Sequence, residues 1–101
     1  MSSLYREIAD LDRLIHEPAR LSIMALLYGV EEADFLYLLK TTGLSKGNLS
    51  AHISKLEEAG YVDIKKRFIG KKPNTLYRLT AKGRRGFEKY LKVVKKFTKL
   101  G

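Results

Sequence analysis

Residues 45–59 have types and spacing suited to binding a polar surface. Leu49, Ile53 and Leu56 recur at i, i+4 and i+7, the spacing of a buried helical stripe. The opposite side has no carboxylate before Glu57, so we expect it to contact a partner rather than water. This side and the start of the helix carry small, hydroxyl, amide and ammonium residues: Ser45, Lys46, Gly47, Asn48, Ser50, Ala51, Ser54 and Lys55.

The chemistry of these side chains fits nucleic acid. The Asn48 amide and the Ser50 and Ser54 hydroxyls can donate to and accept from base edges. Lys46 and Lys55 can reach phosphates or a guanine edge. Small residues let the helix backbone approach a groove, and the positive end of the helix dipole favours phosphate.

Positive charge is concentrated in the same part of the chain. The 101-residue protein has a net charge of +9. Residues 1–44 hold four basic and seven acidic side chains, whereas residues 45–101 hold 16 basic and four acidic ones. This asymmetry indicates a polyanionic partner facing the second half. The charge alone is also compatible with a surface that serves only solubility, or with the lysine-rich surface of a protein from a thermophile.

Other kinds of chemistry lack the residues they need. The chain has no cysteine, and His16 and His52 have no cluster of carboxylates near them in sequence, so we expect no metal site. His52 can either bond a phosphate or pack as a structural residue. No phosphate-binding glycine loop and no motif of a hydrolase is present, so we expect neither catalysis nor a cofactor.

Length and hydropathy predict one domain, residues 1–101, in the cytoplasm. The apolar runs are too short and too interrupted to cross a membrane. The N-terminus lacks the charged-then-apolar order of a secretory signal.

Four helices are predicted before Gly60, within residues 1–17 and at residues 18–28, 33–41 and 45–59. Ser2 or Ser3 can cap the first helix, and Ser45 can cap the fourth. Gly60 suits a left-handed helix end. The first helix has an apolar seam at near-heptad spacing, formed by Leu4, Ile8, Leu11 and Ile15.

Two strands and a last helix are predicted after Gly60. Val62, Ile64 and Phe68 alternate with charged residues, which is typical of a strand, and residues 75–80 form the second strand. Turn residues between 70 and 74 predict a hairpin with a long loop. Thr80 can cap a helix over residues 81–100, whose start is weakened by Gly83 and Gly86.

This order predicts an α+β, mostly helical fold: a winged helix-turn-helix with a two-stranded wing and a helix at each end. Residues 45–59 would be the recognition helix in the major groove of double-stranded DNA.

The sequence also resembles a known group of proteins at two motifs, GNLSAHISKLEEAGYV and KKRFIGKKPNTLYRLTAKG. They resemble the small prokaryotic winged-helix regulators of the MarR-like and ArsR-like groups, over roughly residues 18–90. The resemblance implies that the recognition helix faces DNA and that wing residues grip the backbone or enter the minor groove. The implied wing residues are Lys65, Arg67, Lys71, Lys72, Asn74 and Arg78.

Relatives of this kind usually act as homodimers joined by their terminal helices, sometimes under a small-molecule effector. The resemblance therefore implies an interface from the seam Leu4, Ile8, Leu11 and Ile15 and from Tyr90, Val94 and Phe97. The chain departs from the group in two respects. It lacks the cysteine ligands of arsenic-type sensors, and it is shorter than a typical MarR-like protein, which puts an effector pocket in doubt.

These observations predict a sequence-specific transcriptional regulator acting as a homodimer. Three alternatives stay open: a nonspecific architectural DNA-binding protein, a winged-helix scaffold for protein partners, and an RNA-binding protein. The hydrogen-bonding face argues against the first and the basic wing against the second. The third lacks an expected pair of exposed aromatic residues for stacking bases.

Overall fold

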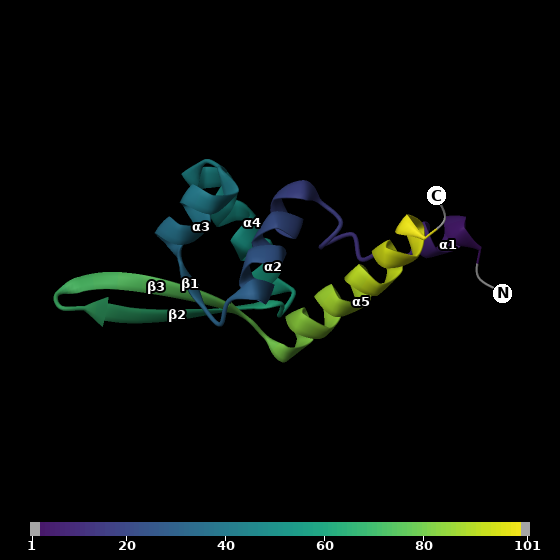
Figure 1. Ribbon diagram of the computed structural model, residues 1–101. Coiled ribbons are helices and arrows are strands. Elements are labelled where there is room, and N and C mark those ends of the chain that lie inside the picture. Colours follow the sequence, from purple (N-terminus) through teal and green to yellow (C-terminus); the bar gives the residue numbers. More distant parts are fainter. Residues whose placement is uncertain (1–2, 100–101) are drawn as a thin grey trace.

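A computed structural model describes residues 3–99 of the chain (Figure 1). The helices are α1 (Leu4–Ala9), α2 (Pro18–Gly29), α3 (Phe35–Thr42), α4 (Lys46–Glu58) and α5 (Ala81–Thr98). The strands are β1 (Ala33–Asp34), β2 (Val62–Ile69) and β3 (Lys72–Leu79). The order of three helices, a tight turn, a fourth helix, a hairpin and a last helix confirms the predicted winged-helix fold.

Side-chain caps begin three of the helices where the sequence predicted them. The hydroxyls of Ser3, Ser45 and Thr80 accept hydrogen bonds from the backbone N–H three residues further on, at 3.1, 3.2 and 2.9 Å. Each bond satisfies a donor that the first turn of a helix leaves without a partner. Gly60 follows α4 with φ at +77°, the left-handed conformation that glycine tolerates.

The predicted first and third helices differ from the observed ones. The first ends at Ala9, because Asp12 accepts a 2.9 Å bond from the Leu14 N–H and holds a turn there. Helix α3 starts two residues later than expected. Ala33 and Asp34 instead form β1, which pairs with β3, and Asp34 then caps α3.

The hairpin is tighter and longer than predicted. The pairing of β2 with β3 continues to Ile69 opposite Lys72, so Pro73 and Asn74 lie inside a strand. The prediction of a long loop was therefore wrong. Gly70, at φ +63°, occupies the first position of a two-residue turn, where a type II′ turn favours glycine.

One hydrophobic core joins all the elements except α1. Ile23, Met24 and Leu27 of α2 are fully buried and lie at its centre, with Leu38 of α3 and Leu49 of α4. The sheet, in the order β1–β3–β2, covers this core with its inner end.

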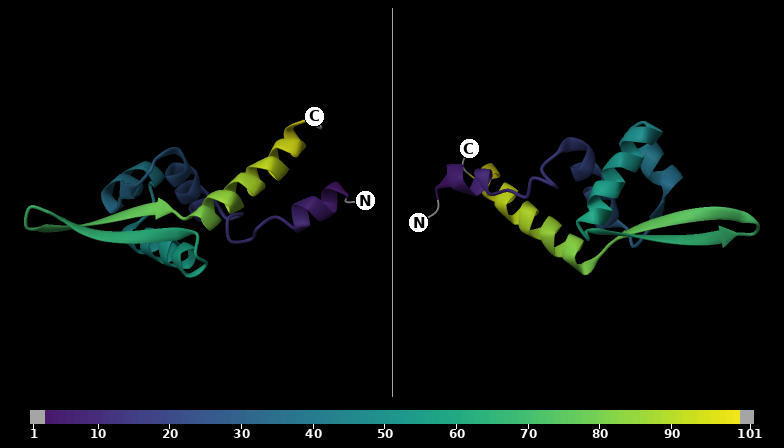
Figure 2. Two further views of the ribbon diagram at one scale, coloured as in Figure 1. Left: turned by 90° about the horizontal axis from the view of Figure 1, so that it is seen from below. Right: turned by 180° about the vertical axis from the view of Figure 1, so that it is seen from behind.

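The molecule is elongated, at 57 × 25 × 21 Å. The wing and α5 leave the helices in opposite directions in both views of Figure 2. None of the helices within residues 3–99 is long and apolar enough to cross a membrane.

Candidate nucleic-acid interface

Helix α4 presents the predicted recognition face to solvent. Leu49, Ile53 and Leu56 are buried against the core, as their spacing predicted. All eight predicted contact residues on the other side are exposed: Ser45, Lys46, Gly47, Asn48, Ser50, Ala51, Ser54 and Lys55. The first turn contains no acidic residue, so its free N–H groups and positive dipole end are not neutralised locally.

A polar junction fixes α4 against α2. Arg20 Nη1 lies 3.1 Å from His52 Nδ1, and Glu17 Oε2 lies 3.7 Å from the same nitrogen. Glu17 also caps α2 by accepting from the N–H groups of Ala19 and Arg20. Of the two roles open to His52, this geometry favours the structural one.

The surroundings of Glu17 favour its charged form. Burial raises the pKa of this carboxyl, but the backbone N–H groups of Ala19 and Arg20 oppose burial, as do the nearby His52 and Arg20 side chains. Together they hold the pKa below its ordinary value of 4.5. At neutral pH Glu17 is therefore charged beside Arg20 at the start of α2, and His52 joins α4 to this pair.

The wing is cationic on both strands, and the structure adds detail to its predicted contacts. Lys65, Arg67, Lys71 and Lys72 are exposed. The Asn74 amide oxygen accepts a 3.0 Å bond from Arg67 Nε across the hairpin, so Asn74 positions a cation. Arg78 Nε lies 3.8 Å from Asp63 Oδ2, which reduces its availability for a phosphate.

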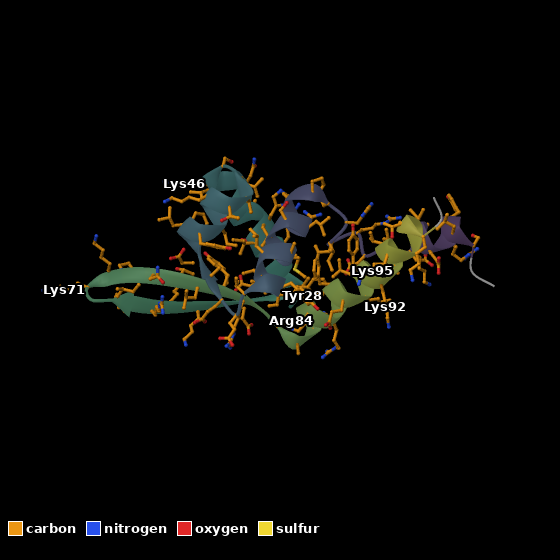
Figure 3. The ribbon with its side chains drawn as sticks, in the orientation of Figure 1. Tyr28, Lys46, Lys71, Arg84, Lys92 and Lys95 are labelled. Atoms are coloured by element: carbon orange, nitrogen blue, oxygen red, sulfur yellow. The ribbon has the colours of Figure 1, made fainter. Side chains whose placement is uncertain are left out.

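The recognition helix and the wing lie at the same end of the molecule. Figure 3 shows Lys46, at the start of α4, and Lys71, at the tip of the hairpin, toward one end, whereas Lys92 and Lys95 lie along α5. Because both elements carry positive charge and lie at one end, together they form a surface large enough to bind an extended polyanion.

The residues predicted for a dimer interface fall into two groups. Leu11, Ile15 and Tyr90 are buried within the core of a single chain, so they have no surface for a partner. Leu11 and Ile15 are buried because the chain leaves the helical path after Ala9 and turns inward, whereas Tyr90 lies on the face of α5 that packs against the core. The single chain therefore gives no support to these three as interface residues. Leu4 and Ile8 on α1 are 42% and 44% exposed, and Val94 and Phe97 are partly buried on α5.

Contacts of the N-terminal segment with α5 and with the turn between α4 and β2 were not predicted. Tyr90 Oη lies 2.8 Å from His16 Nδ1, and Tyr61 donates its hydroxyl to Asp12. Burial, and then the bond to Asp12, raise the pKa of Tyr61 to about 12. Sequence spacing offers no signal for such pairs, which are 74 and 49 residues apart.

The wing tip holds a second feature that the sequence analysis missed. Phe68 was expected on the buried face of its strand, but it is 73% exposed and its neighbour Ile69 is 58% exposed. The strand extends beyond the core at this point, so alternation no longer implies burial. The available signal was the position of both residues directly before the turn glycine.

The comparisons with known proteins agree with this geometry. A family model described as a winged helix DNA-binding domain matches residues 19–98. An uncharacterized protein of Methanocaldococcus jannaschii is 40% identical over 79 residues, which cover 78% of this chain and 86% of that protein.

Solved structures share the fold over nearly the whole chain. The transcriptional regulator homologue protein from Pyrococcus horikoshii OT3 is 30% identical with a TM-score of 0.85, covering 95% of this chain and 94% of its own. A putative transcriptional regulator of the MarR family from Enterococcus faecalis V583 has a TM-score of 0.80 at 18% identity, covering 99% and 90%. The predicted class, a DNA-binding transcriptional regulator, is confirmed at this level, and the chain belongs to the winged helix DNA-binding domain family.

Proposed function

We propose that this regulator binds specific sites in double-stranded DNA as a homodimer, with α4 in the major groove and the wing on the flanking backbone and minor groove. The observation that carries the proposal is the face of α4. It is exposed, free of carboxylates before Glu57, and made of residues that can bond bases or let the backbone approach them.

Hydrogen-bonding groups on this face favour specific over nonspecific binding. Phosphate contacts alone position a protein without reading sequence. Asn48 can form the bidentate amide contact that distinguishes adenine, and the Ser50 hydroxyl is exposed on the other flank of the same helix. A purely architectural protein would need cations here rather than an amide and hydroxyls.

The wing supplies the second contact. Lys65, Lys71 and Lys72 are exposed cations, and Arg67 is held in place by Asn74. They can bind phosphates on either side of the minor groove next to the major groove that α4 occupies. A wing of this charge also argues against the scaffold alternative, in which it would meet a protein.

The proposed dimer uses the far end of the molecule. Helix α1 lies beside the C-terminal end of α5, where Lys96 Nζ is 2.8 Å from Glu7 Oε1 (Figure 1). Leu4 and Ile8 of α1 remain exposed, and Val94 and Phe97 of α5 are only partly buried. A two-fold axis at this end would leave both recognition helices free to enter successive major grooves, about one helical turn apart.

A small-molecule effector, if one acts on this protein, is proposed to bind between the N-terminal segment and α5. A hollow of 190 Å³ there is lined by Asp10, Asp12, Tyr61, Lys89 and Tyr90 with the aliphatic Leu11 and Val93. A ligand in this position would touch the elements proposed to form the dimer. We propose no catalytic activity for the protein and a cytoplasmic location, where chromosomal DNA is accessible.

The proposal is tested by selection from fragmented genomic DNA of the source organism, followed by footprinting of the retained fragments. It predicts discrete protected sites with two related half-sites. Asn48→Ala should weaken binding to such a site roughly tenfold or more, the scale of one lost bidentate base contact. The same change should leave binding to unrelated DNA unaltered.

A matched control is Ser22→Ala, an exposed change on α2, outside the face of α4, the wing and the proposed dimer end, that should affect neither kind of DNA. Equal retention of all fragments, with a steep loss of binding in salt, would instead establish the architectural alternative.

A further inference from the structure

The tip of the wing carries two apolar side chains that the fold does not cover. Phe68 and Ile69, the last residues of β2, are 73% and 58% exposed. Within the described part of the chain they lie outside the hydrophobic core and the residues packed against it. Exposed apolar residues at the end of a strand are an aggregation hazard, and their small buried area contributes little to folding.

The charge around the tip indicates what it contacts. Lys65, Lys66 and Arg67 precede the apolar pair, Lys71 and Lys72 follow it, and no acidic residue occurs between Asp63 and Glu88. Two such tips would repel each other, so a second copy of the chain is a poor partner. Double-stranded DNA combines a polyanionic surface with an apolar interior of stacked bases, and it matches both parts of the tip.

The hairpin holds Phe68 and Ile69 far from the core. Strand pairing continues to Ile69 opposite Lys72, and a two-residue turn closes the end. Directly behind the pair, the bond from Arg67 to Asn74 fixes a cation across the strands. Figure 3 shows Lys71 at the far end of the hairpin, away from the helices. The apolar side chains therefore extend as far from the core as the charges that would hold them against phosphates.

We propose that Phe68 is an apolar wedge that enters a base step from the minor groove and bends the bound duplex, while Ile69, the next residue of the strand, faces the other side of the hairpin. The inference rests on the proposed function, which places the wing at the flanking minor groove. Apolar side chains inserted in this way unstack the step and kink the duplex by about 20–90°. Since pyrimidine–purine steps open most easily, the wedge would select such steps without a hydrogen bond to any base.

The test uses the full chain and a duplex recovered by the genomic selection. A series of duplexes carries a single 2-aminopurine at successive positions outside the major-groove contacts, because its fluorescence rises when its stacking is lost. We expect a rise at one step per half-site with the wild-type protein at saturation. Phe68→Ala should abolish this rise and weaken binding roughly tenfold, whereas Phe68→Leu should retain most of it.

Lys71→Gln is the matched control at the same tip. It should lower affinity and reduce the salt dependence of binding by about one phosphate contact, while the fluorescence rise at saturation stays intact. Phe68→Ala should do the reverse and leave the salt dependence unchanged. Both residues are exposed, so thermal melting of either variant should match that of the wild type.

The outcomes that would overturn the wedge differ from the outcome that would overturn the proposed function. Specific binding with no change in 2-aminopurine fluorescence, or with equal changes for wild type and Phe68→Ala, would overturn the wedge and leave the proposed function intact. Absence of DNA binding by the wild type would overturn both. Binding to phosphatidylserine vesicles that requires Phe68, without base unstacking, would overturn the wedge and assign the tip to a lipid surface.

Discussion

Gly47 illustrates how a single residue in α4 balances stability against binding. It is the second residue of the helix, and a Cβ added there would meet no atom within 4 Å. Gly47→Ala should therefore raise the free energy of unfolding by roughly 0.5–1 kcal/mol, because alanine loses less backbone entropy in a helix. The added methyl would also hold the backbone away from the groove and weaken specific DNA binding roughly tenfold.

Thermal melting and fluorescence anisotropy with a labelled site measure the two effects of Gly47→Ala. Gly29→Ala is the control, since its position at the end of α2 is equally open but lies outside the proposed interface. It should at most raise stability and should leave affinity unchanged. Affinity of Gly47→Ala equal to that of the wild type would contradict the close approach of α4.

Residues that act through local chemistry were the most predictable from sequence. The caps Ser3, Ser45 and Thr80 were placed correctly, because a hydroxyl before an apolar-periodic run has one nearby N–H to bond. The pairs His16–Tyr90 and Tyr61–Asp12 were not, because they depend on how distant segments pack.

At the scale of elements, the Glu17 carboxylate at the junction of α2 with α4 predicts a pH dependence. The lowered pKa of Glu17 means that the folded state favours its charged form. The stability gained in this way is fully present above pH 4.5 and is lost as the pH falls below that value through the folded-state pKa.

Glu17→Gln should remove this part of the acid sensitivity. Melting temperatures measured from pH 7 down to pH 3 should fall less steeply for the variant than for the wild type. Glu32→Gln, which removes an exposed carboxylate elsewhere, should follow the wild-type curve. Parallel curves for wild type and Glu17→Gln would show that the junction does not contribute.

The contact between the start of α5 and Tyr61, which lies between α4 and β2, predicts a sharp difference between two glycines. A Cβ on Gly83 would lie 2.1 Å from the backbone oxygen of Tyr61, whereas one on Gly86 would make ordinary contacts at 3.5 Å. Gly83→Ala should destabilise the fold by about 2 kcal/mol or more, because backbone atoms must move apart. Gly86→Ala should be tolerated. Equal denaturation midpoints in urea for the two variants would refute this packing.

Elements were predictable where periodicity and local chemistry agreed. Helix α4 has both an apolar stripe and a cap, and its predicted bounds hold to within a residue at either end. Strand β1 could not be found, because two residues have no periodicity and its existence depends on pairing with β3. The hairpin was placed correctly, but Pro73 and Asn74 were predicted to be turn residues and instead lie within β3. Gly83 seemed to weaken α5, yet its lack of a side chain is what lets that helix pack against Tyr61.

At the scale of the whole molecule, the proposed dimer predicts a dependence on α1. Leu4→Asp with Ile8→Asp places two charges on an exposed apolar surface that contributes little to the single-chain fold. Light scattering after size exclusion should give twice the mass of one chain for the wild type and one chain mass for the variant. The monomer should bind a two-half-site duplex much more weakly, since the two contacts are no longer linked.

A dimer that survives both substitutions would place the interface elsewhere. The sequence could not show which residues are available for an interface, because the near-heptad spacing in the first 15 residues predicted one continuous seam. In the fold the helix ends at Ala9, so the first part of the seam is exposed on α1 and the part after Asp10 is buried.

The most direct test of the central claim is chemical protection of the bound duplex. Dimethyl sulfate reports guanine N7 in the major groove, and hydroxyl radicals report the backbone and minor groove. With α4 as the recognition helix, guanine N7 should be protected in two half-sites about one helical turn apart. Minor-groove protection should flank each half-site and shrink for a Lys71→Gln, Lys72→Gln variant. Protection confined to the minor groove, or spread evenly along the duplex, would contradict the account.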